Sequence, residues 1–192
     1  IDTKLRTAVE AWYPRIVETL PSEGFVAPAK FDIKFNKDAQ GVAATGGTHI
    51  FCSAPWFKQN LDGEAVGAVV HELVHVAQQY RSRRNPSWLV EGVADYIRWF
   101  KYEPASLRPR PNPDRARYTD SYRTTAAFLE YVTTHHAHEF VVKMNAAMRQ
   151  GRYSSELWKA YTGKSVDELW TLYVASLKGE PAPAAAAEPA HD

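Results

Sequence analysis

The stretch VVHELVHVAQQY, residues 69–80, holds two histidines four residues apart with a glutamate beside the first. On a helix His71 and His75 lie on one face, one turn from each other. Their imidazole nitrogens can then meet at one point about 2.0–2.1 Å from each, which is the length of a zinc–nitrogen bond. Glu72 has a side chain long enough to reach a water molecule held at that point. The alternative is three polar residues in an amphipathic helix.

The surrounding pattern favours the metal-site interpretation. Residues 62–80 predict a helix that is apolar almost all round, and such a helix is buried. Histidines in it need polar partners, because an unpaired polar group in a core costs free energy. One metal ion satisfies both side chains, so we interpret His71 and His75 as metal ligands and Glu72 as a general base.

Glu91 is the candidate for the third ligand that a zinc site requires. It follows His75 by 16 residues, on a second apolar helix predicted from Ser87 to about residue 100. Asp95 lies one helical turn after Glu91 and is placed to accept the free N–H of a ligating histidine, with His71 as the first choice. The alternative is that Glu91 and Asp95 form an acidic stripe exposed to solvent, but their neighbours in the sequence are mostly apolar.

Two histidines and one glutamate leave the fourth position of a tetrahedral zinc ion open, as in catalytic rather than structural sites. Zinc lowers the pKa of a bound water to about 7 and polarises a carbonyl oxygen. Glu72 is placed to take a proton from that water and to deliver it to the leaving amine. The prediction is amide hydrolysis without a covalent intermediate, with one zinc ion per chain.

The rest of the chain predicts an α+β fold. A helix over residues 3–20, kinked or broken at Pro14, precedes the strands. We expect a small N-terminal mixed β-sheet packed on the active-site helix, followed by a mainly helical C-terminal part. The predicted strands are FDIKFN (31–36), GVAATGG (41–47) and THIFCS (48–53), the last two joined by a turn at Gly46-Gly47. Further helices are predicted at 120–134, 138–150, 154–162 and 166–178, the last opened by the capping box SVDE.

These elements form one predicted domain, residues 1–178, with a sheet-containing part at about 1–80 and a helical part at about 86–178. Residues 101–117 hold four prolines and four arginines and predict an irregular loop. Residues 179–192 read as a low-complexity tail rich in alanine and proline.

Composition excludes several classes of function. The 23 lysines and arginines balance 22 aspartates and glutamates, so no charge bias predicts a nucleic-acid or membrane partner. The single cysteine, Cys52, excludes an internal disulfide and a zinc site built from several cysteines. No signal peptide is visible, and the chain opens at Ile1, which is compatible with removal of a leader. We expect a monomer that acts on peptides or proteins.

Four blocks of the sequence resemble a known family: HELVHVAQQY, WLVEGVADYIRW, YTDSYRTTAAFLEY and the segment KMNAAMRQGRYSSELWKAYTGKSVDELWTLY. Together they are similar to the basic secretory protein family, which is regarded as secreted zinc metallopeptidases of gluzincin type. The resemblance spans about residues 25–177. It implies a zincin-like fold, zinc bound by His71, His75 and Glu91, Glu72 as the base, and export from the cell.

The same resemblance suggests a tyrosine that stabilises the tetrahedral intermediate. SYRTTAAFL is similar to the helix that bears this tyrosine in related gluzincin aminopeptidases, so Tyr122 is the first candidate and Tyr118 the second. A core position is the alternative for Tyr122. GGTHIFCS (46–53) is a candidate edge strand for an extended substrate, or an ordinary strand of the sheet. The leading hypothesis is a secreted zinc endopeptidase, and the alternative is a non-catalytic defence or binding protein that keeps a zinc site.

Overall fold

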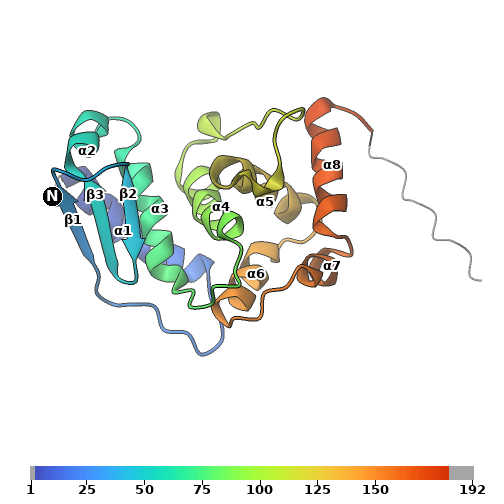
Figure 1. Ribbon diagram of the computed structural model, residues 1–192, viewed down its shortest axis with the longest axis horizontal. Helices are drawn as coiled ribbons and strands as arrows, with labels where there is room; N and C mark the ends of the chain where they lie inside the picture. Colours follow the sequence, from blue (N-terminus) through green and yellow to red (C-terminus); the bar gives the residue numbers. More distant parts are fainter. Residues whose placement is uncertain (1–2, 182–192) are drawn as a thin grey trace, which may run out of the picture.

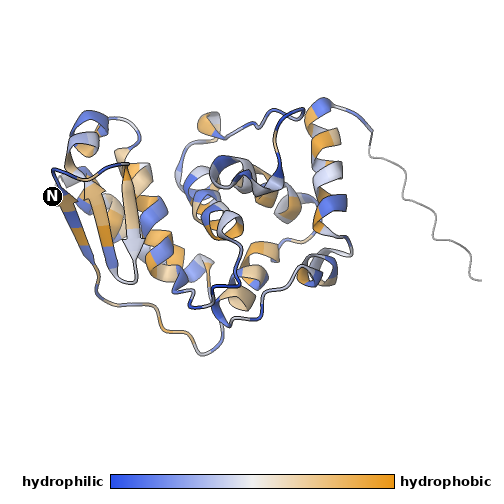
Figure 2. Ribbon diagram, viewed as in Figure 1, coloured by the Kyte–Doolittle hydropathy of each residue, from blue (hydrophilic) through white to orange (hydrophobic). Residues whose placement is uncertain are grey.

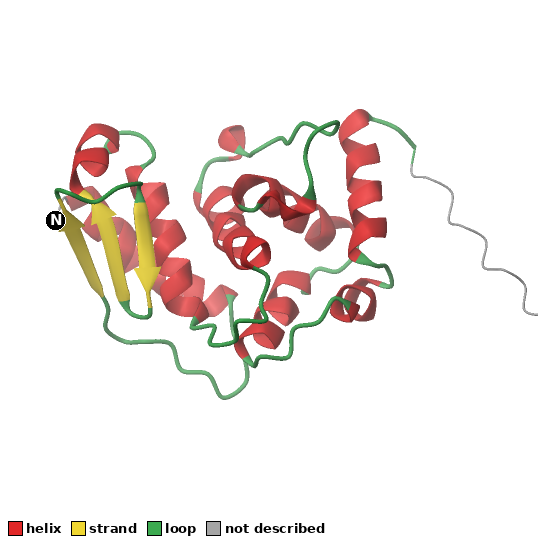
Figure 3. Ribbon diagram, in the orientation of Figure 1, coloured by secondary structure: helices red, strands yellow, loops and turns green. Residues whose placement is uncertain are grey.

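The computed structural model describes residues 3–181, so most of the predicted tail, residues 182–192, lies outside the described part of the chain. The fold is α+β, with a sheet-containing side and a helical side (Figures 1 and 3). The strands are β1 (Asp32–Asn36), β2 (Ala43–Gly46) and β3 (His49–Ser53). The α-helices are α1 (Thr3–Thr19), α2 (Ala54–Asn60), α3 (Ala65–Gln78), α4 (Ser87–Ile97), α5 (Tyr122–His135), α6 (Phe140–Arg149), α7 (Glu156–Thr162) and α8 (Val166–Lys178).

The sheet has the strand order β1-β3-β2, in which β1 is parallel and β2 antiparallel to β3. Gly46 pairs with His49, so β2 and β3 are joined by the two residues Gly47 and Thr48. The predicted turn at Gly46-Gly47 is therefore one residue too early. The suggestion that GGTHIFCS forms an edge is also wrong, because β3 is the central strand and β2 is an edge.

Helix α3 lies between the sheet and the helical side of the molecule (Figure 1). Ile50 and Cys52 of β3 are fully buried, as are Val69, Val70 and Leu73 of α3. Most residues of α3 are buried, which agrees with the prediction of a helix that is apolar almost all round. Within residues 3–181, the helices lack the length and apolar character needed to cross a membrane.

The helical side is built around the contact between α4 and α5. Gly92 of α4 permits a close approach, since a Cβ atom there would lie 2.2 Å from Cγ2 of Thr125 on α5. Behind this contact the rings of Phe128 and Trp158 stack with centroids 5.6 Å apart. Helices such as α8 alternate between hydrophobic and hydrophilic bands, as expected for helices buried on one face (Figure 2).

The structure corrects several local predictions and confirms one. Helix α1 continues through Pro14 without a break. The seven-residue helix α2 was not predicted at all. The predicted loop 101–117 begins inside a π-helical turn, Arg98–Tyr102, and also contains a 3₁₀ turn, Ala105–Leu107. The capping box of α8 is confirmed, because Ser165 and Glu168 exchange side-chain and backbone hydrogen bonds.

Candidate metal centre

Helix α3 presents His71, Glu72 and His75 to a cleft between the two sides of the molecule. Both His71 and Glu72 are 7% exposed. Helix α4 runs beside α3 and places Glu91 across the cleft, with its side chain 28% exposed. The ligand set predicted from the sequence is therefore brought together from two helices, at a point that remains open to solvent on the side of Glu91.

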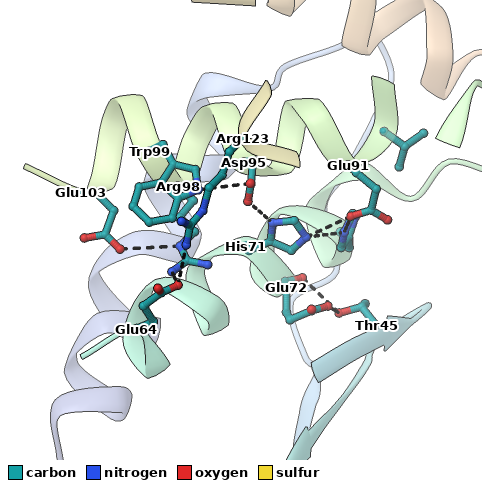
Figure 4. A network of polar contacts seen from close by, with 12 residues as sticks. Thr45, Glu64, His71, Glu72, Glu91, Asp95, Arg98, Trp99, Glu103 and Arg123 are labelled. Carbon is teal, nitrogen blue, oxygen red and sulfur yellow. Dashed lines mark hydrogen bonds and ion pairs between the residues drawn. The ribbon is translucent and has the colours of Figure 1, made fainter. Parts of the chain in front are cut away.

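Three potential ligand atoms converge on one point (Figure 4). Nε2 of His71 lies 3.1 Å from Nε2 of His75 and 3.1 Å from Oε2 of Glu91. Nε2 of His75 lies 3.3 Å from the same carboxylate oxygen. Ligands about 2.0–2.1 Å from a tetrahedral zinc ion are separated by about 3.3–3.4 Å. The three observed separations are within about 0.3 Å of that geometry, so the residues fit a zinc ion.

The other ring nitrogens of both histidines face hydrogen-bond acceptors. Nδ1 of His71 lies 2.7 Å from Oδ1 of Asp95, and Nδ1 of His75 lies 2.7 Å from Oε1 of Gln78. Each Nδ1 therefore carries the proton and donates it. The lone pair of each neutral ring is then on Nε2 and points to the common site, which is the form that binds a metal.

The electrostatics of the cluster favour a cation at this point. Two lone pairs and a carboxylate oxygen about 3 Å apart repel one another unless a proton or a metal ion lies between them. Burial lowers the pKa of His71, but hydrogen bonds with Asp95 and Glu91 outweigh it and raise that pKa to about 9. Burial likewise raises the pKa of Glu91, yet His71 and His75 bring it to about 2. The metal-free site thus holds a proton where a metal would sit.

Asp95 is itself held in place by a second donor. Its Oδ2 accepts a hydrogen bond of 3.1 Å from Nε1 of Trp99, one turn further along the chain. With one oxygen on His71 and the other on Trp99, the 3%-exposed carboxylate has a fixed orientation. The structure therefore gives Asp95 the contacts of a residue that orients a ligand.

A network of ion pairs lies beside Asp95 (Figure 4). Oε2 of Glu64 accepts hydrogen bonds from Arg98 (2.9 Å) and Arg123 (2.8 Å), and Glu103 lies 3.6 Å from Nε of Arg98. Gly67 makes room for this packing on α3, since a Cβ atom there would lie 2.2 Å from Oε1 of Glu103. The network joins the start of α3 to the segments that follow α4 and begin α5.

Glu72 faces the edge strand of the sheet. The hydroxyl of Thr45 on β2 donates a 2.6 Å hydrogen bond to Oε2 of Glu72, and the same oxygen of Thr45 lies 3.3 Å from the carbonyl of Glu72. Both residues line the cleft. The carboxylate is therefore held next to the metal ligands but is not one of them, as a base would be.

The two candidate tyrosines occupy different environments. The ring of Tyr122 stacks on that of His71, with centroids 5.9 Å apart, and Tyr122 is 52% exposed in the cleft. The negative charge of Glu91, and to a smaller extent burial, raises the pKa of its phenol. Tyr118 instead packs against Trp88 and Trp170 and does not line the cleft. Only Tyr122 is brought to the site.

The cleft has a volume of about 1010 Å³ and draws its walls from both sides of the molecule. Strand β2 forms one wall, and α4 with the start of α5 forms the other. Thr45 and Gln78 are among the residues at the site that the sequence analysis missed. A glutamine three residues after a candidate ligand histidine in an apolar helix was the available signal for Gln78, whereas Thr45 reaches Glu72 only through the fold of the sheet.

Comparison of the chain with known proteins shows its family. A family model described as "peptidase of plants and bacteria" matches residues 18–173, which include all the residues of the cleft. No curated protein and no solved structure matches the chain. Because the family model covers most of the sequence, from within α1 to within α8, the chain belongs to the basic secretory protein family, the peptidases of plants and bacteria.

Proposed function

We propose that this protein is a zinc-dependent endopeptidase. The observation that carries the proposal is the convergence of Nε2 of His71, Nε2 of His75 and Oε2 of Glu91 within 3.1–3.3 Å of one another. These three residues would hold one zinc ion. When bound, zinc supplies a water of lowered pKa and a Lewis acid for the scissile carbonyl.

Glu72 is the general base in this proposal. It takes a proton from the attacking water and passes it to the leaving amine, so that no covalent intermediate with the protein is needed. The 2.6 Å bond from Thr45 holds the carboxylate in one orientation and leaves its other oxygen for the water. Asp95 contributes indirectly, through the orientation of His71.

Tyr122 is the proposed donor to the negative oxygen of the tetrahedral intermediate. Its ring stands beside His71, and a phenol, with an ordinary pKa of about 10, is protonated at neutral pH and therefore able to donate. A donor aimed at a developing oxyanion in a partly closed site typically contributes about 10²–10³-fold in rate.

Strand β2 is the proposed binding edge for the substrate backbone. The N–H of Ser53 donates to the carbonyl of Val42. Hydrogen-bonded and non-bonded pairs alternate along an antiparallel ladder, so Ala43 and Thr45 direct their backbone groups away from β3. Both residues line the cleft. An extended peptide can add to this edge and continue past both ends, which favours cleavage within a chain.

The arrangement of sheet, α3 and α4 also supports a zincin-like fold, with the sheet packed on the helix that bears both histidines and the third ligand on the next helix. We further propose that the protein acts outside the cell, and the support for this is its membership of the basic secretory protein family.

Cleavage of an unfolded protein by zinc-loaded enzyme tests the proposed function. We expect the wild type to cleave within the chain and Glu72→Gln to lose about 10²–10⁴-fold in kcat/KM, because the glutamine cannot accept the proton. Glu18→Gln, at an exposed position of α1, is the matched control and should keep full activity. Zinc content is measured for all three proteins. A wild type that binds zinc but cleaves no peptide in a broad library would favour the non-catalytic binding protein instead.

A further inference from the structure

Gln78, the last residue of α3, is a buried glutamine with both ends of its amide engaged. It is 2% exposed. Its Oε1 lies 2.7 Å from Nδ1 of His75, and its Nε2 donates a 3.1 Å hydrogen bond to the backbone carbonyl of Val90 on α4. Val90 immediately precedes Glu91. One side chain therefore touches a histidine on α3 and the backbone beside a carboxylate on α4.

We propose that Gln78 is a positioning residue that fixes the tautomer and orientation of His75 and ties it to the helix of Glu91. The proposal rests on the metal site of the proposed function. It adds the counterpart of Asp95, which holds the other histidine, and it assigns this role to an uncharged side chain.

The hydrogen-bond network allows one arrangement of these protons. The carbonyl of Val90 can only accept, so the amide nitrogen of Gln78 must face it. The amide oxygen then faces His75, and an oxygen of this kind can only accept. Nδ1 of His75 must therefore donate, which leaves the lone pair of the neutral ring on Nε2, toward the cluster. A reversed amide would set two donors against each other or two acceptors against each other.

The backbone of Gln78 is held as firmly as its side chain. Arg149 on α6 donates to the carbonyls of Ala77 (2.9 Å) and Gln78 (3.1 Å), the last carbonyls of α3. Gln79 follows in the left-handed region, with φ of 45°, and its side-chain amide Nε2 donates to the carbonyl of Gly47 in the turn of the sheet. The end of α3 is thus fixed by contacts from three sides before any metal binds.

A neutral partner suits the charge balance of this site. Glu91 and Asp95 already place two carboxylates in contact with His71, 3.1 Å from Nε2 and 2.7 Å from Nδ1, and Glu72 lies in the same cleft. A carboxylate on Nδ1 of His75 would make that ring a stronger electron donor, which would lower the effective positive charge of a bound metal and weaken its action as a Lewis acid. The amide of Gln78 orients His75 without adding charge, and its Nε2 joins α3 to α4 through the hydrogen bond to Val90.

Zinc affinity, measured by competition with a chromophoric chelator, is the first test. Gln78→Met keeps the length of the side chain but removes both hydrogen bonds, and we expect zinc binding about 10–100-fold weaker than in the wild type. Gln59→Met changes an exposed glutamine of α2, outside the cleft, and should leave the affinity unchanged. An affinity of Gln78→Met within twofold of the wild type would overturn the proposal.

Proton NMR of the metal-free protein supplies a readout that a purely structural role would not move. The wild type should show a slowly exchanging Nδ1–H proton for His75. That signal should vanish in Gln78→Met and return in Gln78→Glu, whose carboxylate still accepts. Persistence of the signal in Gln78→Met would contradict the assignment. The resonance does not need zinc, so failure of the wild type to bind zinc would refute the proposed function without deciding the role of Gln78.

Discussion

At the residue scale, Tyr122 stands out because its backbone is unusual as well as its position. Ser121 and Tyr122 both have positive φ values, 65° and 46°, where residues other than glycine are uncommon. Strained backbone of this kind persists where surrounding contacts hold it, and it occurs often at functional sites. Here it turns the chain into α5 so that the tyrosine ring lies over His71.

Tyr122→Phe should lower kcat by about 10²-fold while KM and zinc content change little, because the ring remains and only the donor to the oxyanion is lost. Steady-state kinetics with zinc analysis would measure this. Tyr118→Phe serves as the control, since that tyrosine lies outside the cleft, and its kcat should stay at the wild-type value. Equal turnover in Tyr122→Phe and the wild type would rule out the role of the phenol.

Residues that act through local spacing are the ones that the sequence can predict. His71 and His75 share a helix face whatever the tertiary fold, and Asp95 follows Glu91 by one turn in the same way. Thr45 is different, because it reaches Glu72 across 27 residues and only through the position of β2 at the sheet edge. Tyr118 and Tyr122 lie one turn apart in sequence, and their different surroundings depend on packing that no local pattern encodes.

At the scale of elements, the closest helix contact of the site is that between α4 and α5. Helix α4 carries Glu91 and Asp95, so any displacement of α4 moves a proposed metal ligand. Gly92 lies between these two carboxylates on the chain, and its missing side chain is what allows Thr125 to approach.

Gly92→Ala should therefore destabilise the fold by about 1–3 kcal/mol, because the new methyl group overlaps the side chain of Thr125 and the core cannot expand freely. Urea unfolding of the metal-free protein would measure the free-energy change. Gly63→Ala is the matched control, since the nearest atom to its new Cβ would be a carbonyl oxygen at 3.6 Å, an ordinary contact. A stability of Gly92→Ala equal to that of the wild type would show that the two helices can separate without cost.

The sequence predicts helices correctly where the pattern of apolar residues is long. Helices α3, α4 and α8 follow the repeat of apolar residues, and the capping box at Ser165 marks the start of α8. The strands were placed, but their order was not, because pairing partners are separated in sequence and the pattern of each strand is the same at an edge or in the centre. Helix α2 escaped prediction because seven residues are too few for a repeat to show.

At the scale of the whole molecule, the proposed metal site joins the two sides of the fold. His71 and His75 come from α3 on the sheet-containing side, and Glu91 comes from α4 on the helical side (Figure 1). An ion bound by all three would hold these sides together, and it would bind only the folded chain with full affinity.

Removal of zinc should therefore lower the melting temperature of the protein. A ligand at about 1,000 times its Kd contributes about 4 kcal/mol, which corresponds to a shift on the order of 10 °C for a chain of this size. Differential scanning calorimetry before and after treatment with a chelator would measure it. Added zinc should restore the original value, whereas magnesium, which prefers six oxygen ligands, should not. A melting temperature that changes neither with the chelator nor with added zinc would argue against a metal in the folded protein.

The α+β class and the balance of sheet and helix could be predicted from the order of the patterns along the chain, short alternating strands first and helices after. The cleft could not, because its walls come from residues as distant as Val42 and Thr124. Its shape depends on how α4 and α5 pack, and hence on side-chain volumes at positions such as Gly92.

The bare edge of β2 has a consequence for self-association. A strand edge that can accept a substrate can also accept the edge of another molecule, which is how sheets aggregate. Strand β2 has only four residues and lies in a cleft, where a second sheet would meet α4 before it could pair. The opposite edge, β1, carries Asp32 and Lys34, charges of the kind that discourage pairing between sheets. Strand β2 can thus pair with a single extended peptide, as proposed for the substrate, but not with the edge of a whole sheet.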